Sequence, residues 1–133
     1  MARIEEGFVT HLSGVAALVD LIGNRIYPMH LPEGVDMPAI TYQRISGNRM
    51  RSHSGPSGTA NPRYTFTCWA ETYGGAKAVA DQLRFILDGF NGAMGGVDVQ
   101  AGLVEDDRDD FDTQLELYQV QVDAILWHAE ALV

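Results

Sequence analysis

Apolar residues recur every three or four positions over the first 22 residues, which predicts an amphipathic helix. Gly7 and Gly14 lie inside this helix and cost about 1 kcal/mol each relative to alanine, so packing has to hold it together. Gly23 is typical of the residue that follows a helix, and it marks the predicted end. The apolar side of the helix comprises Ile4, Phe8, Leu12, Val15, Val19 and Ile22.

Four later segments alternate between apolar and polar residues, as strands with one buried face do. A short extended piece, residues 25–28, precedes the first of them and leads into a loop bounded by two prolines. The segment with the most regular alternation is the second, which is rich in aromatic and β-branched residues. The four predicted strands span residues 39–46, 63–71, 97–103 and 118–126.

A second amphipathic helix is predicted between the second and third strands. Thr72 is a suitable N-cap for this helix, because its hydroxyl can accept a backbone N–H of the first turn. Asp88 and Gly89 end the apolar pattern. The apolar stripe of the helix comprises Ala76, Val79, Ala80, Leu83, Ile86, Leu87 and Phe90.

The predicted element order is therefore α-β-β-α-β-β, within a single domain that spans residues 1–133. Because each strand has one apolar and one polar face, we predict a two-layer α+β fold. Its four-stranded sheet would be antiparallel or mixed, with the helices on one face and a long loop between the first two strands. The expected core consists of Tyr64, Phe66, Cys68, Val99, Val120 and Val122 from the strands and Phe8, Leu12, Leu83 and Ile86 from the helices.

The polar face of the predicted sheet still carries Trp69, Ile125 and Trp127. Aromatic side chains of this kind are enriched where proteins meet, so this face is one candidate interface. The alternative is that the N-terminal helix or the C-terminal tail of the same chain covers them.

Composition indicates a globular protein, with 46% hydrophobic and 20% charged residues. The formal net charge of −9 argues against a protein that wraps nucleic acid, because neutralising phosphates requires clustered cations. No apolar run approaches the roughly 20 residues of a membrane span, and the first residues lack the apolar core of a secretory signal. We therefore expect a soluble protein that does not enter a membrane and is made in the cytoplasm.

The sequence contains no pattern that points to catalysis, a cofactor or a metal. Cys68 is the single cysteine, and its place in an apolar strand indicates a buried small hydrophobe rather than a nucleophile. Glycine-rich and serine-rich stretches match neither a phosphate-binding loop nor a nucleophile elbow. The histidines lack the close spacing of zinc ligands; they are His11, His30, His53 and His128.

Two oppositely charged segments stand out against this background. Between Met37 and Ala70 the chain has arginines but no carboxylate, whereas residues 105–112 hold six carboxylates. We interpret the two segments as loops that could match when copies of the chain meet head to tail. The alternative is a mobile linker and a solvated acidic turn. The candidate contact residues are Arg44, Arg49, Arg51, His53, Arg63, Glu105, Asp106, Asp107, Asp109, Asp110 and Asp112.

An ordered set of segments makes the chain resemble the tail-completion, or tail-terminator, proteins of long-tailed bacteriophages and gene transfer agents. In chain order these segments are residues 22–28, 38–44, 65–73, 106–109 and 118–128, with a Gly/Ser-rich loop after the second. The resemblance covers nearly the whole chain and implies an α/β fold without catalytic residues. It also implies a hexameric ring in the virion, at the head-proximal end of the tail, that joins the tail tube to a head-side connector.

The charge of the chain agrees with that role, since DNA that passes through a ring should not adhere to it. The expected partners are other copies of the chain, the tail tube protein and a head-side connector or stopper protein. The alternative from the residues alone is an unrelated small binding module or regulatory adaptor with the same two-layer fold.

Overall fold

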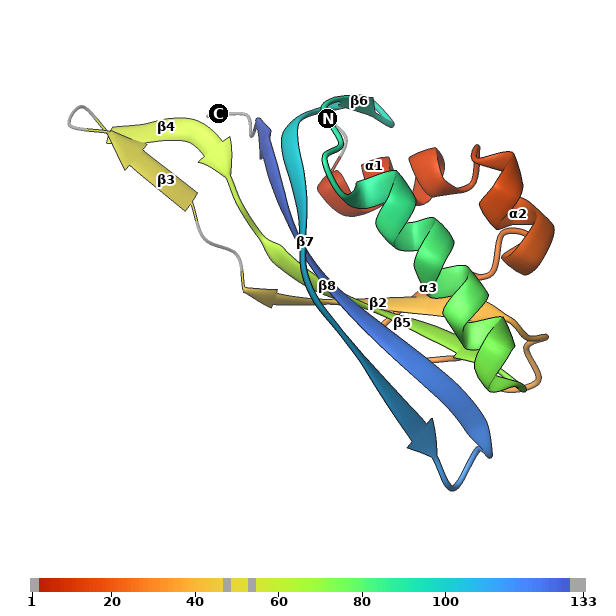
Figure 1. The fold of residues 1–133 in the computed structure, drawn as a ribbon. Coiled ribbons are helices and arrows are strands. Elements are labelled where there is room, and N and C mark those ends of the chain that lie inside the picture. The colour runs from red at the N-terminus through yellow and green to blue at the C-terminus, as the bar shows by residue number, and fades with distance from the viewer. Residues whose placement is uncertain (1–2, 47–48, 53–54, 130–133) are drawn as a thin grey trace.

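The computed structural model describes residues 3–46, 49–52 and 55–129. This part of the chain forms three helices that lie against one face of a single sheet (Figure 1). The helices are α1 (Ile4–Leu12), α2 (Ala16–Ile22) and α3 (Tyr73–Leu87). The prediction of an α+β fold with its helices on one face of a sheet is confirmed.

The segment that we predicted as one helix forms two, α1 and α2, so the prediction of a continuous helix was wrong. The chain leaves the helical conformation at Val15, which is extended with φ −94° and ψ 110°. Just before it, the Gly14 N–H donates to the carbonyl of His11 rather than to the residue four positions back. Gly14 carries the conformational cost of a helical glycine, so the break falls at the weakest point of the pattern. The apolar residues Phe8, Leu12 and Ile22 are nevertheless all buried.

Over the residues that the structure describes, the sheet has eight strands rather than the predicted four, and it is mixed because β1 and β2 run parallel while the other pairs are antiparallel. Six strands follow the order β1-β2-β5-β8-β4-β3, while β7 pairs with β8 and β6 with β7. The extended piece at residues 25–28 contributes the short edge strand of this order. The bounds are β1 (Ile26–Pro28), β2 (Ala39–Ser46), β3 (Arg49–Ser52), β4 (Gly55–Ala60), β5 (Arg63–Ala70), β6 (Gly92–Met94), β7 (Val97–Asp112) and β8 (Leu117–Ala129).

The core lies between the helices and the inner face of β5, β8 and the first part of β7. Phe8 of α1 is its centre, with edge-on aromatic contacts to Tyr42, Tyr64 and Phe66 at centroid distances of 4.9, 5.1 and 5.2 Å. All the predicted core residues are buried except Ile86, which is only partly buried against the cluster. The N-cap of α3 is also confirmed, since the Thr72 hydroxyl accepts the Gly75 N–H at 3.0 Å.

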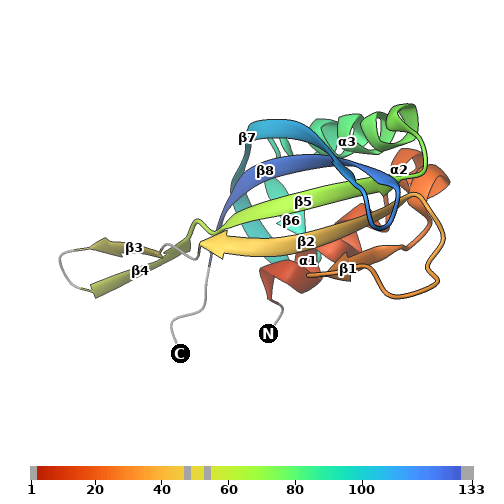
Figure 2. The same cartoon turned by 90° about the horizontal axis from the view of Figure 1, so that it is seen from below.

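The long segment between β2 and β5, which are the first two predicted strands, contains a pair of strands and not only the loop that we predicted. β3 and β4 pair with each other in antiparallel fashion. β4 then joins the side of β8 that β5 occupies farther along, through Thr59 opposite Ala129 and Ala60 opposite His128. We call β3 and β4 together the arm, because they extend away from the rest of the molecule (Figure 2).

The acidic segment is likewise a strand and not a loop. β7 continues through residues 105–112, and Asp106 to Asp112 pair with β8 residue by residue. A register irregularity between Val104 and Asp106 places Glu105 in a bulge. The turn of this hairpin is therefore displaced to residues 113–116, beyond the carboxylates.

Candidate interaction surface

The arm carries the basic end of the predicted contact surface. In Figures 1 and 2 it leaves the sheet at the far end from α2 and has no helix beside it. Its strands are rich in glycine, serine and proline, and the sequence offers only Met50 as a large apolar residue between Gly47 and Pro62. A two-stranded hairpin without an apolar face is marginally stable in water by itself.

The carboxylates of β7 divide between the two faces of the sheet, as alternation along a strand requires. Asp107 and Asp109 lie on the face that α3 covers, where each contacts a cation of that helix. Arg84 Nη1 lies 3.3 Å from Asp107 Oδ2, and Lys77 Nζ lies 2.9 Å from Asp109 Oδ1. These ion pairs attach β7 to α3 within one chain.

Hydrogen bonds shift the pKa values of the charged groups between α3 and β7. The Tyr73 hydroxyl donates to Asp109 Oδ2 at 2.6 Å, and this bond, together with that from Lys77, holds the pKa of Asp109 below its ordinary value. The hydrogen bond to Asp109 in turn raises the pKa of Lys77. The bond that Arg84 Nη2 donates to Asp81 at 2.6 Å raises the pKa of Arg84. Each of these three shifts favours the charged form of its group, Asp109, Lys77 or Arg84.

The opposite face of the sheet carries a second polar network. Its centre is Asp123, which is only 8% exposed. Asp123 accepts hydrogen bonds from Thr65 Oγ1 at 2.7 Å and from Arg108 Nη1 at 2.8 Å. The buried carboxylate is thus paired, as a charge removed from water has to be. Trp69 donates through Nε1 to Thr41 Oγ1 at 2.9 Å, so this half-buried indole is hydrogen-bonded inside the chain.

Among the side chains that the structure describes, one predicted basic residue contacts one predicted acidic residue. Arg63 Nη2 lies 2.7 Å from Glu105 Oε2, and their side chains are 39% and 33% exposed. Arg44 is exposed on β2, and Arg49 and Arg51 lie on β3. His53 lies outside the described residues.

Two of the predicted acidic residues bond to the backbone around the hairpin turn. Asp112 Oδ1 accepts the N–H groups of Gln114 and Leu115, both at 2.9 Å, and so fixes the turn. Asp110 Oδ1 accepts the N–H of Phe111 at 2.7 Å, and its side chain is exposed.

Sequence reasoning missed the cations that hold this acidic strand in place, above all those of α3. The signal was present in the sequence, because Lys77, Asp81, Arg84 and Asp88 recur at three- and four-residue spacing along one side of the helix. Arg108, inside the acidic run, was the other missed partner.

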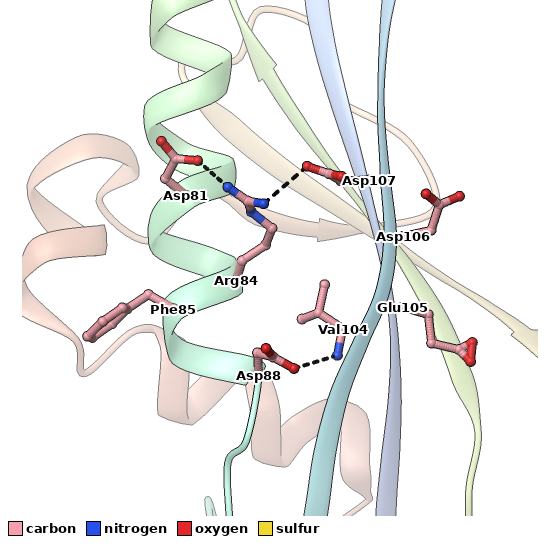
Figure 3. A pocket seen from close by; sticks show the side chains of 8 residues that line it. All are labelled: Asp81, Arg84, Phe85, Asp88, Val104, Glu105, Asp106 and Asp107. Carbon is pink, nitrogen blue, oxygen red and sulfur yellow. Dashed lines mark hydrogen bonds and ion pairs between the residues drawn. The ribbon is translucent and has the colours of Figure 1, made fainter.

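An open groove of about 740 Å³ lies between α3 and β7 (Figure 3). Arg84 reaches across it between Asp81 and Asp107, and Asp88 accepts the Val104 N–H at 3.1 Å. Phe85 is 86% exposed at the rim. The remaining lining residues are Glu105 and Asp106, so carboxylates dominate the groove.

Within residues 3–46, 49–52 and 55–129, no group of three or more His, Cys, Asp or Glu side chains is arranged to hold a metal ion. In the same part of the chain, none of the helices combines the length and the apolar character needed to cross a membrane.

The comparisons with known proteins agree with one another. The family model described as tail completion protein gp17 matches residues 7–129. The chain belongs to this family. Tail completion proteins are structural components of a virion tail and not enzymes, so membership decides against the unrelated binding module considered from the sequence.

The fold has a counterpart in an assembled particle. A chain described as "Virion of native gene transfer agent (GTA) particle" superposes with a TM-score of 0.77 and 13% sequence identity, over 93% of each chain. At this identity the likeness concerns the fold alone, and it includes nearly all of both chains. No curated protein matches the sequence.

Proposed function

We propose that this tail completion protein assembles into a ring at the head-proximal end of the tail, where it ends the tail tube and joins it to a head-side connector. A ring of six subunits is the number that the family resemblance implies. The observation that carries the proposal is the arm, an extension of the sheet whose composition gives it no apolar core of its own.

A feature of this kind needs a partner surface, because an isolated two-stranded hairpin is marginally stable. The arm and the acidic strand β7 are different surfaces of one molecule, so a contact between them is heterologous. A heterologous contact that repeats around an axis closes into a ring when the rotations of successive subunits add up to a full turn. The charge pattern supports this partner choice, since the chain has no carboxylate between Met37 and Ala70 and six in residues 105–112.

The internal ion pairs narrow the acidic residues that would face a neighbour. Asp107 and Asp109 are engaged by α3, and Glu105 by Arg63. Asp106, whose side chain is 66% exposed and whose contact with Arg108 is 4.0 Å long, and Asp110 are the residues that we assign to the contact. In the ring, DNA would pass without specific binding, consistent with a net charge of −9.

The test is assembly on the tail tube itself. Purified protein should give a mass of several subunits by light scattering as its concentration rises, and ring-shaped particles by electron microscopy. Added to tubes of the cognate tail tube protein, it should cap one end and stop further growth. Protein that stays monomeric and leaves tube length unchanged would refute the proposal.

A further inference from the structure

β7 is covered along the first part of its outer edge, on the side away from β8. Val97 to Val99 pair with β6. Gly102 then exchanges hydrogen bonds with the 89–90 segment, donating to Phe90 at 2.9 Å and accepting from Gly89 at 2.8 Å. The Val104 N–H donates to the Asp88 side chain. Every stretch of this edge up to Val104 therefore has a partner.

The edge is open beyond Val104. Over residues 105–112, no strand in the described part of the chain pairs with β7 other than β8, which occupies its inner side. In Figure 1 this half of β7 runs along the outside of the sheet, with β8 on its inner side. An open edge presents unpaired N–H and C=O groups, which are a template for another strand.

The arm supplies a second open edge. Within the described residues β3 pairs with β4 alone, so one side of β3 lacks a strand partner. β4 is less suited to accept a strand, since β8 already pairs with its last residues and Pro56 lacks an N–H group. The open edge of the arm is thus that of β3, and in Figure 1 it lies far from the open half of β7.

The two edges have complementary chemistry. β3 contributes Arg49 and Arg51 and no carboxylate. Beside the open half of β7 lie the exposed Asp106 and Asp110 and the carboxylate-lined wall of the groove. An incoming basic strand would lie next to that carboxylate-lined wall.

We propose that β3 of one copy pairs with the open edge of β7, residues 105–112, in the next copy, so that the sheet continues from subunit to subunit. This inference rests on the proposed ring and specifies the contact that builds it. Backbone hydrogen bonds would supply the affinity of such a strand addition, and the charges would select the partner.

The competing interpretation is that the carboxylates only protect an edge strand from unwanted pairing, as charged side chains often do. A charge exchange distinguishes the two. One variant carries Arg49→Glu and Arg51→Glu in the arm; a second carries Asp106→Lys and Asp110→Lys in β7. Each variant alone should need at least about tenfold more protein for half-assembly than wild type, because like charges then meet at every contact.

Mixed in equal amounts, the two variants should assemble again. In an alternating ring, the Glu-bearing arm of one variant meets the Lys-bearing edge of the other, and the remaining contacts keep the wild-type charges. A matched control for the β7 variant carries Glu33→Lys and Asp36→Lys, at two exposed residues in the loop before β2. It replaces two carboxylates by two lysines, as the β7 variant does, and should assemble as wild type does. Circular dichroism should show each variant folded.

Backbone pairing itself is tested by hydrogen exchange on wild type. Amides within residues 105–112 should gain protection on assembly, while those of the loop 29–38 should not. Assembly of either variant at wild-type concentrations, failure of the mixture to assemble, or unchanged exchange at 105–112 would overturn the strand pairing and leave the ring itself standing. Wild-type protein that never assembles would overturn both.

Discussion

Phe66 lies where the aromatic core is densest, and its replacement by alanine tests the packing most directly. The side chain is 0% exposed, and its ring contacts those of Phe8 and Tyr64 at centroid distances of 5.2 and 6.2 Å. Truncation of a buried phenylalanine costs about 3–5 kcal/mol, through lost burial and the cavity left behind. The two aromatic contacts favour the upper half of that range, because aromatic pairs contribute about 0.5–1.5 kcal/mol beyond burial.

A loss of this size is a large share of the roughly 5–15 kcal/mol that stabilises a typical domain. Urea unfolding followed by tryptophan fluorescence should give the change in free energy, and a thermal scan should show a midpoint lower by about 10 °C or more. Cys68 provides an independent probe. It is fully buried and burial raises the pKa of its thiol, so a thiol reagent should label it only as the protein unfolds.

The matched control is Phe85→Ala, the same truncation at a side chain that is 86% exposed. It should change the free energy of unfolding by no more than about 0.5 kcal/mol. If Phe66→Ala melts within a degree or two of wild type, or if the two variants lose similar stability, the assignment of the β5 faces is wrong.

Two further predictions concern stability. Gly102→Ala should destabilise by about 1–3 kcal/mol in urea unfolding, because the added methyl group would collide with the Leu87 carbonyl, whereas Gly74→Ala, with open space around it, should be nearly neutral. Burial, and then the hydrogen bond to Glu5, raise the pKa of Tyr64 above its ordinary value near 10. The folded state therefore favours the protonated phenol, and the contribution of this phenol to the free energy of unfolding is fully present below pH 10 and is lost as the pH rises above 10. Wild type should therefore lose stability more steeply than Tyr64→Phe between pH 10 and 11.5, and equal slopes would contradict this.

The parts of the fold that could be read from the sequence are those in which packing and periodicity agree. α3 has a threonine cap, a continuous apolar stripe and a terminal glycine, and each signal falls where the helix begins, packs or ends. β5 alternates throughout its length because one of its faces is the core and the other is polar. In both elements the local pattern and the tertiary environment require the same residues.

The arm and the second half of β7 were mistaken for loops for opposite reasons. The arm has almost no apolar residues, so no period of two can be read from it. The second half of β7 is so rich in carboxylates that it reads as solvated, although β8 pairs with it to Asp112. Both segments are strands because a neighbouring strand continues beside them, and that information lies elsewhere in the chain.

The ion pairs could be predicted only in part, because most depend on register across the sheet. Arg63 and Glu105 are 42 positions apart and belong to strands on either side of β8. Only the pairing of both strands with β8 brings them together. Asp81 and Arg84, by contrast, are neighbours on one helix, and their spacing alone predicts the contact.

The ion pairs that β7 makes within its own chain reduce the contribution of charge to the free energy of assembly. Exposed ion pairs give only about 0–1 kcal/mol each, and Lys77 and Arg84 already engage two of the β7 carboxylates within the chain. Charge at the remaining positions is too weak to hold a ring by itself. Its stronger effect is on which surfaces meet and in what register. The affinity of a subunit contact on this surface therefore has to come from other groups, and within the described residues the edge of β7 at 105–112, which no second strand pairs, offers backbone groups of this kind.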